Sequence, residues 1–189
     1  MPPPQDQARP RSSSETIRRV LAAVVFVPIF VVLVHDLGPI AFFLLVALSG
    51  LFAVGEFYRL HLGPTAWPWW GWVGVAATGL LLSSTQWPAS FSDRTVLMGT
   101  LATALCMPLF SDKPLKESLQ DGMVLIMGVL YVGLSLGYLL LTRAQPDGAM
   151  LIFFVVLVTW AGDTGAYIAG KSMGRHRLAP IISPKKTYE

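Results

Sequence analysis

Residues 122–141 read GMVLIMGVLYVGLSLGYLLL, twenty positions without a charged side chain. About 20 consecutive apolar residues in a helix cross the roughly 30 Å hydrocarbon core of a bilayer. A soluble core would instead divide its apolar residues into short periodic stripes. The stretch therefore predicts a membrane-spanning helix, and the rest of the chain repeats the pattern.

Composition extends this prediction to the whole chain. Hydrophobic residues make up 53% of the sequence and charged residues 13%, whereas soluble domains have about 25% charged residues. Gly, Pro and Asp separate the apolar blocks, as expected for connections between helices. We predict an all-α polytopic membrane protein with about six transmembrane helices, at residues 17–34, 39–54, 67–84, 95–110, 122–141 and 149–170.

The basic residues predict the orientation. With six spans, twelve Lys and Arg residues lie on one side of the membrane and two on the other. Because cytoplasmic loops carry the excess of Lys and Arg, both termini are predicted to be cytoplasmic. The twelve are Arg9, Arg11, Arg18, Arg19, Arg59, Lys113, Lys116, Lys171, Arg175, Arg177, Lys185 and Lys186, and the two are Arg94 and Arg143.

The chain divides into three predicted regions. Residues 1–14 are rich in Pro, Ser and Arg and predict a disordered cytoplasmic tail. Residues 15–148 hold five spans, and residues 149–189 hold the sixth span with a polar segment after it. One cysteine, Cys106, excludes an internal disulfide.

Two short motifs are interpreted as helix packing. Residues 133–137 match the G-x-S-x-G pattern of a hydrolase nucleophile, but that motif needs a strained strand-to-helix turn. Here it lies inside an apolar span, where G-x-x-x-G lets helices approach closely. Residues 165–172 match the P-loop expression. A P-loop follows a strand and opens a helix, and this stretch instead ends a predicted span.

Asp163 and the segment after it carry the polar chemistry. An ionisable residue inside an apolar span is costly and indicates function, although an interfacial Asp at a helix end is the simpler interpretation. The segment 171–189 holds five cations and four hydroxyl side chains. Anchoring beside anionic lipid needs only that charge. A phosphate-rich substrate would use the charge and the hydroxyls together, and a nearby carboxylate could hold Mg²⁺.

The order of the motifs in this region resembles the central stretch of bacterial phosphatidate cytidylyltransferases (CDP-diacylglycerol synthases). The resemblance covers about thirty residues, and its order and spacing are more specific than any one motif. It rests on Trp160-Ala161-Gly162-Asp163-Thr164-Gly165-Ala166-Tyr167, Gly170, Gly174-Arg175-His176-Arg177-Leu178 and Ser183-Pro184-Lys185-Lys186-Thr187-Tyr188-Glu189.

The resemblance implies transfer of the cytidylyl group of CTP to phosphatidate at the bacterial cytoplasmic (inner) membrane. It implies Mg²⁺ as cofactor, CTP and phosphatidate as substrates in a lipid bilayer, no nucleic acid, and leaves a homodimer open. The implied catalytic residues are Asp163, Lys185 and Lys186, and Asp163 is also the implied metal ligand. The implied substrate-binding residues are Thr164, Tyr167, Arg175, Arg177, Ser183 and Thr187.

Some features depart from the family. Its members continue with further spans and a Lys, Arg and Asp signature, so we expect this chain to be a fragment that is inactive alone. One carboxylate is few for metal-assisted transfer, and Glu56, Asp112, Glu117 and Asp121 are other predicted cytoplasmic acids. Two alternatives stay open: a CTP-dependent transferase acting on another lipid, and a non-enzymatic membrane transporter or assembly protein.

Overall fold

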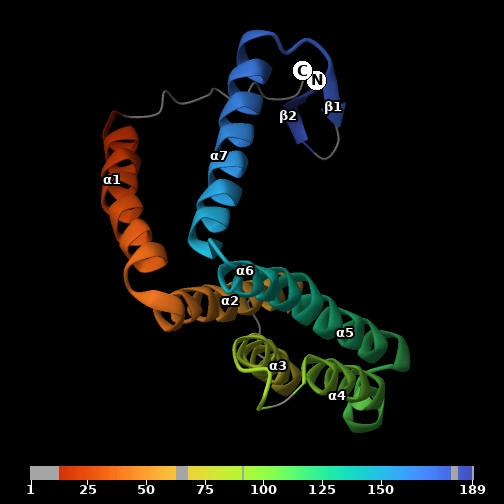
Figure 1. The fold of residues 1–189 in the computed structure, drawn as a ribbon. Helices are drawn as coiled ribbons and strands as arrows, with labels where there is room; N and C mark the ends of the chain where they lie inside the picture. Colours follow the sequence, from red (N-terminus) through yellow and green to blue (C-terminus); the bar gives the residue numbers. More distant parts are fainter. Residues whose placement is uncertain (1–12, 63–67, 91, 180–182, 189) are drawn as a thin grey trace, which may run out of the picture. The chain divides into compact units, whose positions relative to one another are not determined.

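The computed structural model describes residues 13–62, 68–90, 92–179 and 183–188, and its regular secondary structure is helical except for one short hairpin (Figure 1). The elements are α1 (Ser13–His35), α2 (Gly38–Leu62), α3 (Trp69–Gln86), α4 (Asp93–Cys106), η1 (Met107–Phe110), α5 (Leu115–Gly128), η2 (Val129–Leu134), α6 (Ser135–Arg143), α7 (Gly148–Ser172), β1 (Arg177–Ala179) and β2 (Ser183–Thr187). They form two units, Met1–Leu44 and Leu45–Glu189.

The first unit holds α1 and the beginning of α2. The turn between them closes with hydrogen bonds from the amides of Asp36 and Leu37 to the carbonyl of Val32. Gly38 follows with φ of 77°, a left-handed conformation that glycine adopts without a steric penalty. The predicted tail at residues 1–14 lies largely outside the described residues, and α1 already includes Ser13.

The second unit is built around α3, which packs against α4, α5, η2 and α6. Its main core contains Val54 and Tyr58 of α2, Trp70 of α3, and Leu125 and Val132 from the long helix that follows. Together with Ala104 of α4, apolar side chains from four separate blocks of the sequence therefore meet in one core. The core fixes α2 and α5, which carry the polar residues His61 and Asp121 discussed below.

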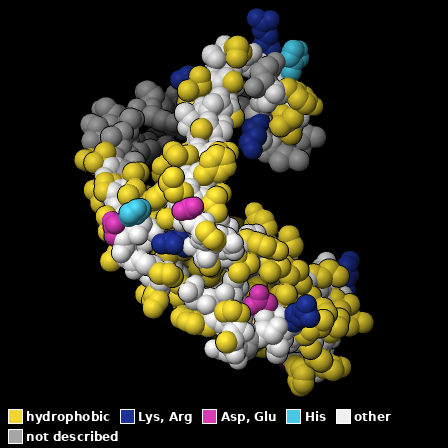
Figure 2. Space-filling model, in the orientation of Figure 1, with side chains coloured by type: hydrophobic (Ala, Val, Ile, Leu, Met, Phe, Trp, Pro, Cys, Tyr) yellow, Lys and Arg dark blue, Asp and Glu magenta, His cyan; other side chains and the backbone are white. Residues whose placement is uncertain are grey.

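Within the described residues, three helical segments are long and apolar enough to cross a membrane: Gly38–His61, Leu115–Arg143 and Gly148–Ser172. Val24–His35 is a shorter apolar helix. Figure 2 shows hydrophobic side chains over much of the visible surface, with few charged side chains among them. Exposed apolar surface of this extent is expected where lipid is the solvent. The predicted all-α membrane fold is confirmed, and the number of six spans stays a prediction.

The segment quoted first is one nearly continuous helix with a π-helical turn, η2, in its middle. A Cβ atom added at Gly133 would lie 3.1 Å from a methyl carbon of Leu81, and one at Gly137 would lie 3.4 Å from Oγ1 of Thr85. Both glycines thus face α3 and allow its close approach. This confirms that the G-x-S-x-G match is a helix-packing motif.

Candidate functional site

Asp163 lies on an open face of α7. Of the residues in this helix, Gly148 and Ile152 are buried, while Asp163, Thr164 and Tyr167 are all exposed. A Cβ atom at Gly162 or Gly165 would meet nothing within 4 Å. Among the described residues, the Asp163 carboxylate has no hydrogen-bond or ion-pair partner, so it is available to a ligand.

The helix continues without a break through the P-loop match. Residues 165–172 all have helical backbone, and Nζ of Lys171 lies 5.9 Å above the ring of Tyr167. A P-loop requires a loop whose backbone N–H groups surround phosphate. The P-loop interpretation is therefore excluded, as the sequence predicted.

A β-hairpin follows α7 (Figure 1). Strand β1 pairs antiparallel with β2, placing Arg177 opposite Thr187 and Ala179 opposite Ser183, with an irregular register between these pairs. The amide of Tyr188 extends the pairing by donating to the carbonyl of His176 at 3.0 Å. Four residues predicted as ligands, Arg177, Ser183, Lys186 and Thr187, thus belong to one hairpin.

The hairpin packs back onto the end of α7. A Cβ atom at Gly170 would lie 3.3 Å from Oγ1 of Thr187, and one at Gly174 would lie 2.8 Å from the same atom. Oγ1 of Thr187 is buried and has no hydrogen-bond partner among the described residues. Two glycines of the recognised pattern therefore make the space into which the threonine fits.

The other predicted residues lie along α7 and the hairpin on either side of this contact. Asp163 precedes Gly170 by seven residues, about 10 Å along the helix axis. Arg175, Arg177 and Lys186 are exposed, whereas Ser183 and Thr187 are half-buried. The side chain of Lys185 lies outside the described part of the chain. The arrangement is an exposed carboxylate followed by a cationic, hydroxyl-bearing hairpin.

The acidic residues do not form a preassembled metal cage. Among the described residues, no group of three or more His, Cys, Asp or Glu side chains could hold a metal ion. Mg²⁺, however, is usually bound by one or two carboxylates together with waters and substrate phosphates. The exposed Asp163 carboxylate fits an ion that arrives with phosphate.

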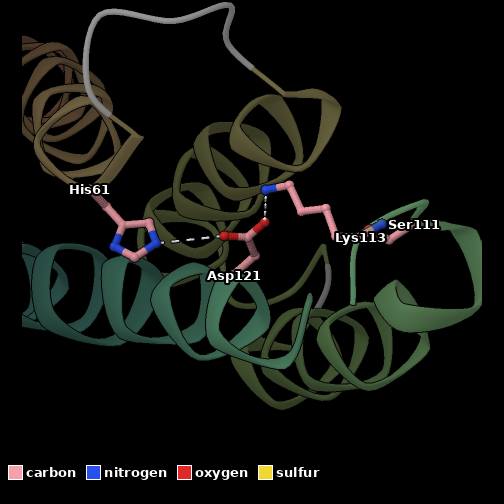
Figure 3. Close-up of polar contacts among 4 residues, drawn as sticks. All are labelled: His61, Ser111, Lys113 and Asp121. Atoms are coloured by element: carbon pink, nitrogen blue, oxygen red, sulfur yellow. Dashed lines mark hydrogen bonds and ion pairs between the residues drawn. The ribbon is translucent and has the colours of Figure 1, made fainter. Parts of the chain in front are cut away.

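A second polar cluster lies between α2 and α5 (Figure 3). The buried carboxylate of Asp121 is 2.5 Å from Nζ of Lys113 and 3.5 Å from Nε2 of His61. The amide of Lys113 donates to Oγ of Ser111 at 3.2 Å. The sequence predicted Asp121 only as a cytoplasmic acid, because residues from segments far apart in the chain give no local signal of contact. The structure shows that it joins helices.

Comparisons with known proteins agree with the recognised pattern. A family model described as "Cytidylyltransferase family" matches residues 17–189. Proteins named phosphatidate cytidylyltransferase from Staphylococcus saprophyticus and Staphylococcus haemolyticus are each 47% identical over 72 residues. The same-named protein of Staphylococcus aureus is 42% identical over 72 residues. Each alignment covers 38% of this chain and 27% of the relative. No solved structure matches.

Proposed function

This chain belongs to the cytidylyltransferase family, and on that premise we propose that it takes part in transferring the cytidylyl group of CTP to phosphatidate. The chain spans about a quarter of the length of the curated relatives that it matches, since the alignments cover 27% of each. The observation that carries the proposal is the contact of Thr187 with Gly170 and Gly174. It sets the cationic hairpin beside the helix that presents Asp163.

The reaction suits residues that neutralise charge. An oxygen of the phosphatidate phosphate attacks the α-phosphorus of CTP, and the bond from that phosphorus to the β-phosphate oxygen breaks. The products are CDP-diacylglycerol and pyrophosphate. The attacking phosphate is already anionic, so no strong general base is needed. Fixed positive charge around the phosphates is therefore the main demand on the protein.

The cations of the hairpin can meet that demand. Lys185 and Lys186 bind phosphates of CTP, and hydroxyls of Ser183 and Thr187 donate hydrogen bonds to phosphate oxygens. In the described conformation Oγ1 of Thr187 is buried, so its hydrogen bond to phosphate needs the hairpin to shift from α7. Arg175 and Arg177 are exposed and suit bidentate binding of the lipid phosphate.

Residues of α7 complete the proposed site. Thr164 and Tyr167 are exposed beside Asp163 and would contact substrate. Asp163 would hold Mg²⁺ jointly with substrate phosphate oxygens, and the ion would supply positive charge for the developing negative charge. The membrane setting brings the lipid substrate to this helix. We place the protein in the bacterial cytoplasmic membrane as a multi-pass protein, which its long apolar helices support.

The test is a transfer assay on the protein in the form that the cell makes, purified in mixed micelles. Labelled CTP is supplied with phosphatidate or with a polyprenyl phosphate of equal concentration. We expect CDP-diacylglycerol and pyrophosphate in equal amounts, from phosphatidate only. Turnover with the polyprenyl phosphate alone would overturn the lipid assignment, and turnover with neither would overturn the transferase.

Asp163→Asn should abolish this turnover while leaving the fold intact, because the carboxylate has no partner among the described residues. The matched control is Asp36→Asn, an exposed acid of the first unit that pairs only with its neighbour His35 at 2.8 Å. Full turnover by Asp163→Asn would show that this carboxylate is not the metal ligand. The proposed transfer activity would still stand on the wild-type assay.

A further inference from the structure

A groove between α2 and α3 lies outside the proposed catalytic site. Its volume is about 370 Å³, and it is lined by Leu48, Phe52, Glu56 and Arg59 of α2 and by Trp72 and Val75 of α3. The α2 side chains recur at intervals of three and four residues, so they share one helix face. The groove follows α2 from Leu48 to Arg59.

Polarity changes from one end of this groove to the other. Leu48 and Arg59 are separated by eleven residues, about 16 Å along the helix axis. That is about half of the roughly 30 Å hydrocarbon core, the depth of one leaflet. Leu48 and Phe52 give an apolar end, and Glu56 and Arg59 give a charged end. A phospholipid has the same order of acyl chain and headgroup.

The charged end carries both signs. Glu56 and Arg59 are exposed and one helical turn apart, and Trp72, 63% exposed, lies beside them at the groove wall. Tryptophan prefers the headgroup level of a membrane. A guanidinium binds phosphate in a bidentate manner, and a carboxylate accepts charge-assisted hydrogen bonds from an ammonium N–H. A headgroup with a phosphate and a primary ammonium complements this pair.

Other headgroups fit less well. An anionic phospholipid would satisfy Arg59 but place negative charge against Glu56. A choline headgroup has the right net charge, but its quaternary nitrogen has no N–H to donate to the carboxylate. The combination of Glu56 and Arg59 therefore selects for the primary ammonium.

We propose that this groove binds one zwitterionic aminophospholipid of the cytoplasmic leaflet. An acyl chain lies along Leu48, Phe52 and Val75, the phosphate binds Arg59, and the ammonium binds Glu56. The site is separate from the α7–hairpin region and does not depend on cytidylyl transfer.

The experiment measures lipid retention by native mass spectrometry on the delipidated protein. Phosphatidylethanolamine, phosphatidylcholine and phosphatidylglycerol with identical acyl chains are added in equal amounts. One charge-assisted hydrogen bond predicts retention of phosphatidylethanolamine about tenfold above phosphatidylcholine. Glu56→Gln should bring this ratio close to one. Glu117→Gln, which removes an exposed acid of α5 outside the groove, should leave it unchanged.

A second variant tests the phosphate contact. Arg59→Gln should lower the retention of all three lipids, with helical content by circular dichroism confirming that the protein is folded. Equal retention of phosphatidylethanolamine and phosphatidylcholine by the wild type would overturn the proposal. Preferred retention of phosphatidylglycerol, or a loss of the ratio in Glu117→Gln, would overturn it as well.

Discussion

The hydroxyl of Tyr58 on α2 donates a 3.0 Å hydrogen bond to the backbone carbonyl of Leu125 on α5. Its ring packs edge-on against Trp70 of α3, with centroids 5.7 Å apart. A Cβ atom added at Gly74 or Gly128 would collide with this ring. Tyr58 therefore joins three helices, and the two glycines make the space for it.

The first prediction concerns this space. Gly128→Ala should lower the free energy of unfolding by about 1–3 kcal/mol, the usual cost of overpacking a core. Tyr58→Phe keeps the ring and removes one hydrogen bond, so it should cost about 0.5–1.5 kcal/mol. Thermal unfolding in detergent, followed by tryptophan fluorescence, measures both.

Gly99→Ala on α4 is the matched control, because a Cβ atom there meets nothing within 4 Å. This change should be neutral or slightly stabilising, since alanine has the higher helix propensity. Equal unfolding temperatures for Gly128→Ala and Gly99→Ala would contradict the packing of Tyr58 described above.

The second prediction concerns the buried carboxylate of Asp121. Lys113→Met should destabilise by about 2 kcal/mol, because it leaves a buried charge with only His61 beside it. Asp121→Asn should cost less, about 1 kcal/mol, because the amide is uncharged and still accepts a hydrogen bond. Removing the cation of Lys113 is therefore expected to destabilise the protein more than removing the negative charge of Asp121.

Chemical unfolding of both variants in detergent checks this order. Lys116→Met is the control, since this lysine is exposed and lies three residues along the chain from Lys113. If Asp121→Asn were the more destabilised variant, the pair in Figure 3 would not be the contact that stabilises this end of α5.

The third prediction concerns the hairpin. A Cβ atom at Gly174 would collide with the carbonyl oxygen of Gly170 and would lie 2.8 Å from Oγ1 of Thr187. Gly174→Ala should therefore displace both the end of α7 and the hairpin, and raise the rate of trypsin cleavage after Arg175 and Arg177 about tenfold through easier local opening. Thr187→Val should leave the cleavage rate unchanged, because Oγ1 of Thr187 has no hydrogen bond to lose among the described residues. Gly162→Ala, where the added carbon meets nothing within 4 Å, is the control.

Several features of the fold were predictable from block length and composition. The predicted span at residues 149–170 corresponds to α7 (Gly148–Ser172), and the one at 122–141 lies within the long helix ending at Arg143. The predicted end of the second span was too early, because α2 continues to Leu62. Hydropathy falls at Glu56 and Arg59, but these residues do not break a helix.

The helix predicted as the fourth span, α4, ends for a local reason that hydropathy does not report. α4 stops at Cys106, and Met107–Phe110 forms a 3-10 turn that contains Pro108. Proline lacks the N–H that would continue the α-helix. Length and polarity set the approximate spans, while backbone chemistry sets their ends.

The residues of the candidate site were named from the order and spacing of motifs, and their roles stay predictions. The geometry of the site was not predicted. The β-hairpin was not predicted, because strands of three and five residues, the second of them with a Pro and two Lys, are too short and too polar to show an alternating pattern. Nor was the Asp121 cluster, since its partner His61 lies sixty residues away in sequence. Contacts between segments that are distant in sequence depend on tertiary packing alone.

The last prediction tests the proposed phosphate contact of the hairpin. Lys186 is exposed, so Lys186→Gln should leave the fold unchanged and remove one positive charge. Loss of a charge-assisted phosphate contact should raise KM for CTP about tenfold, with a smaller change for phosphatidate. Lys186→Arg keeps the charge and should retain most of the affinity. Steady-state kinetics of these variants, with Lys116→Gln as the control, test whether Lys186 contacts a phosphate of CTP. An unchanged KM for CTP in Lys186→Gln would mean that other cations bind the nucleotide phosphates.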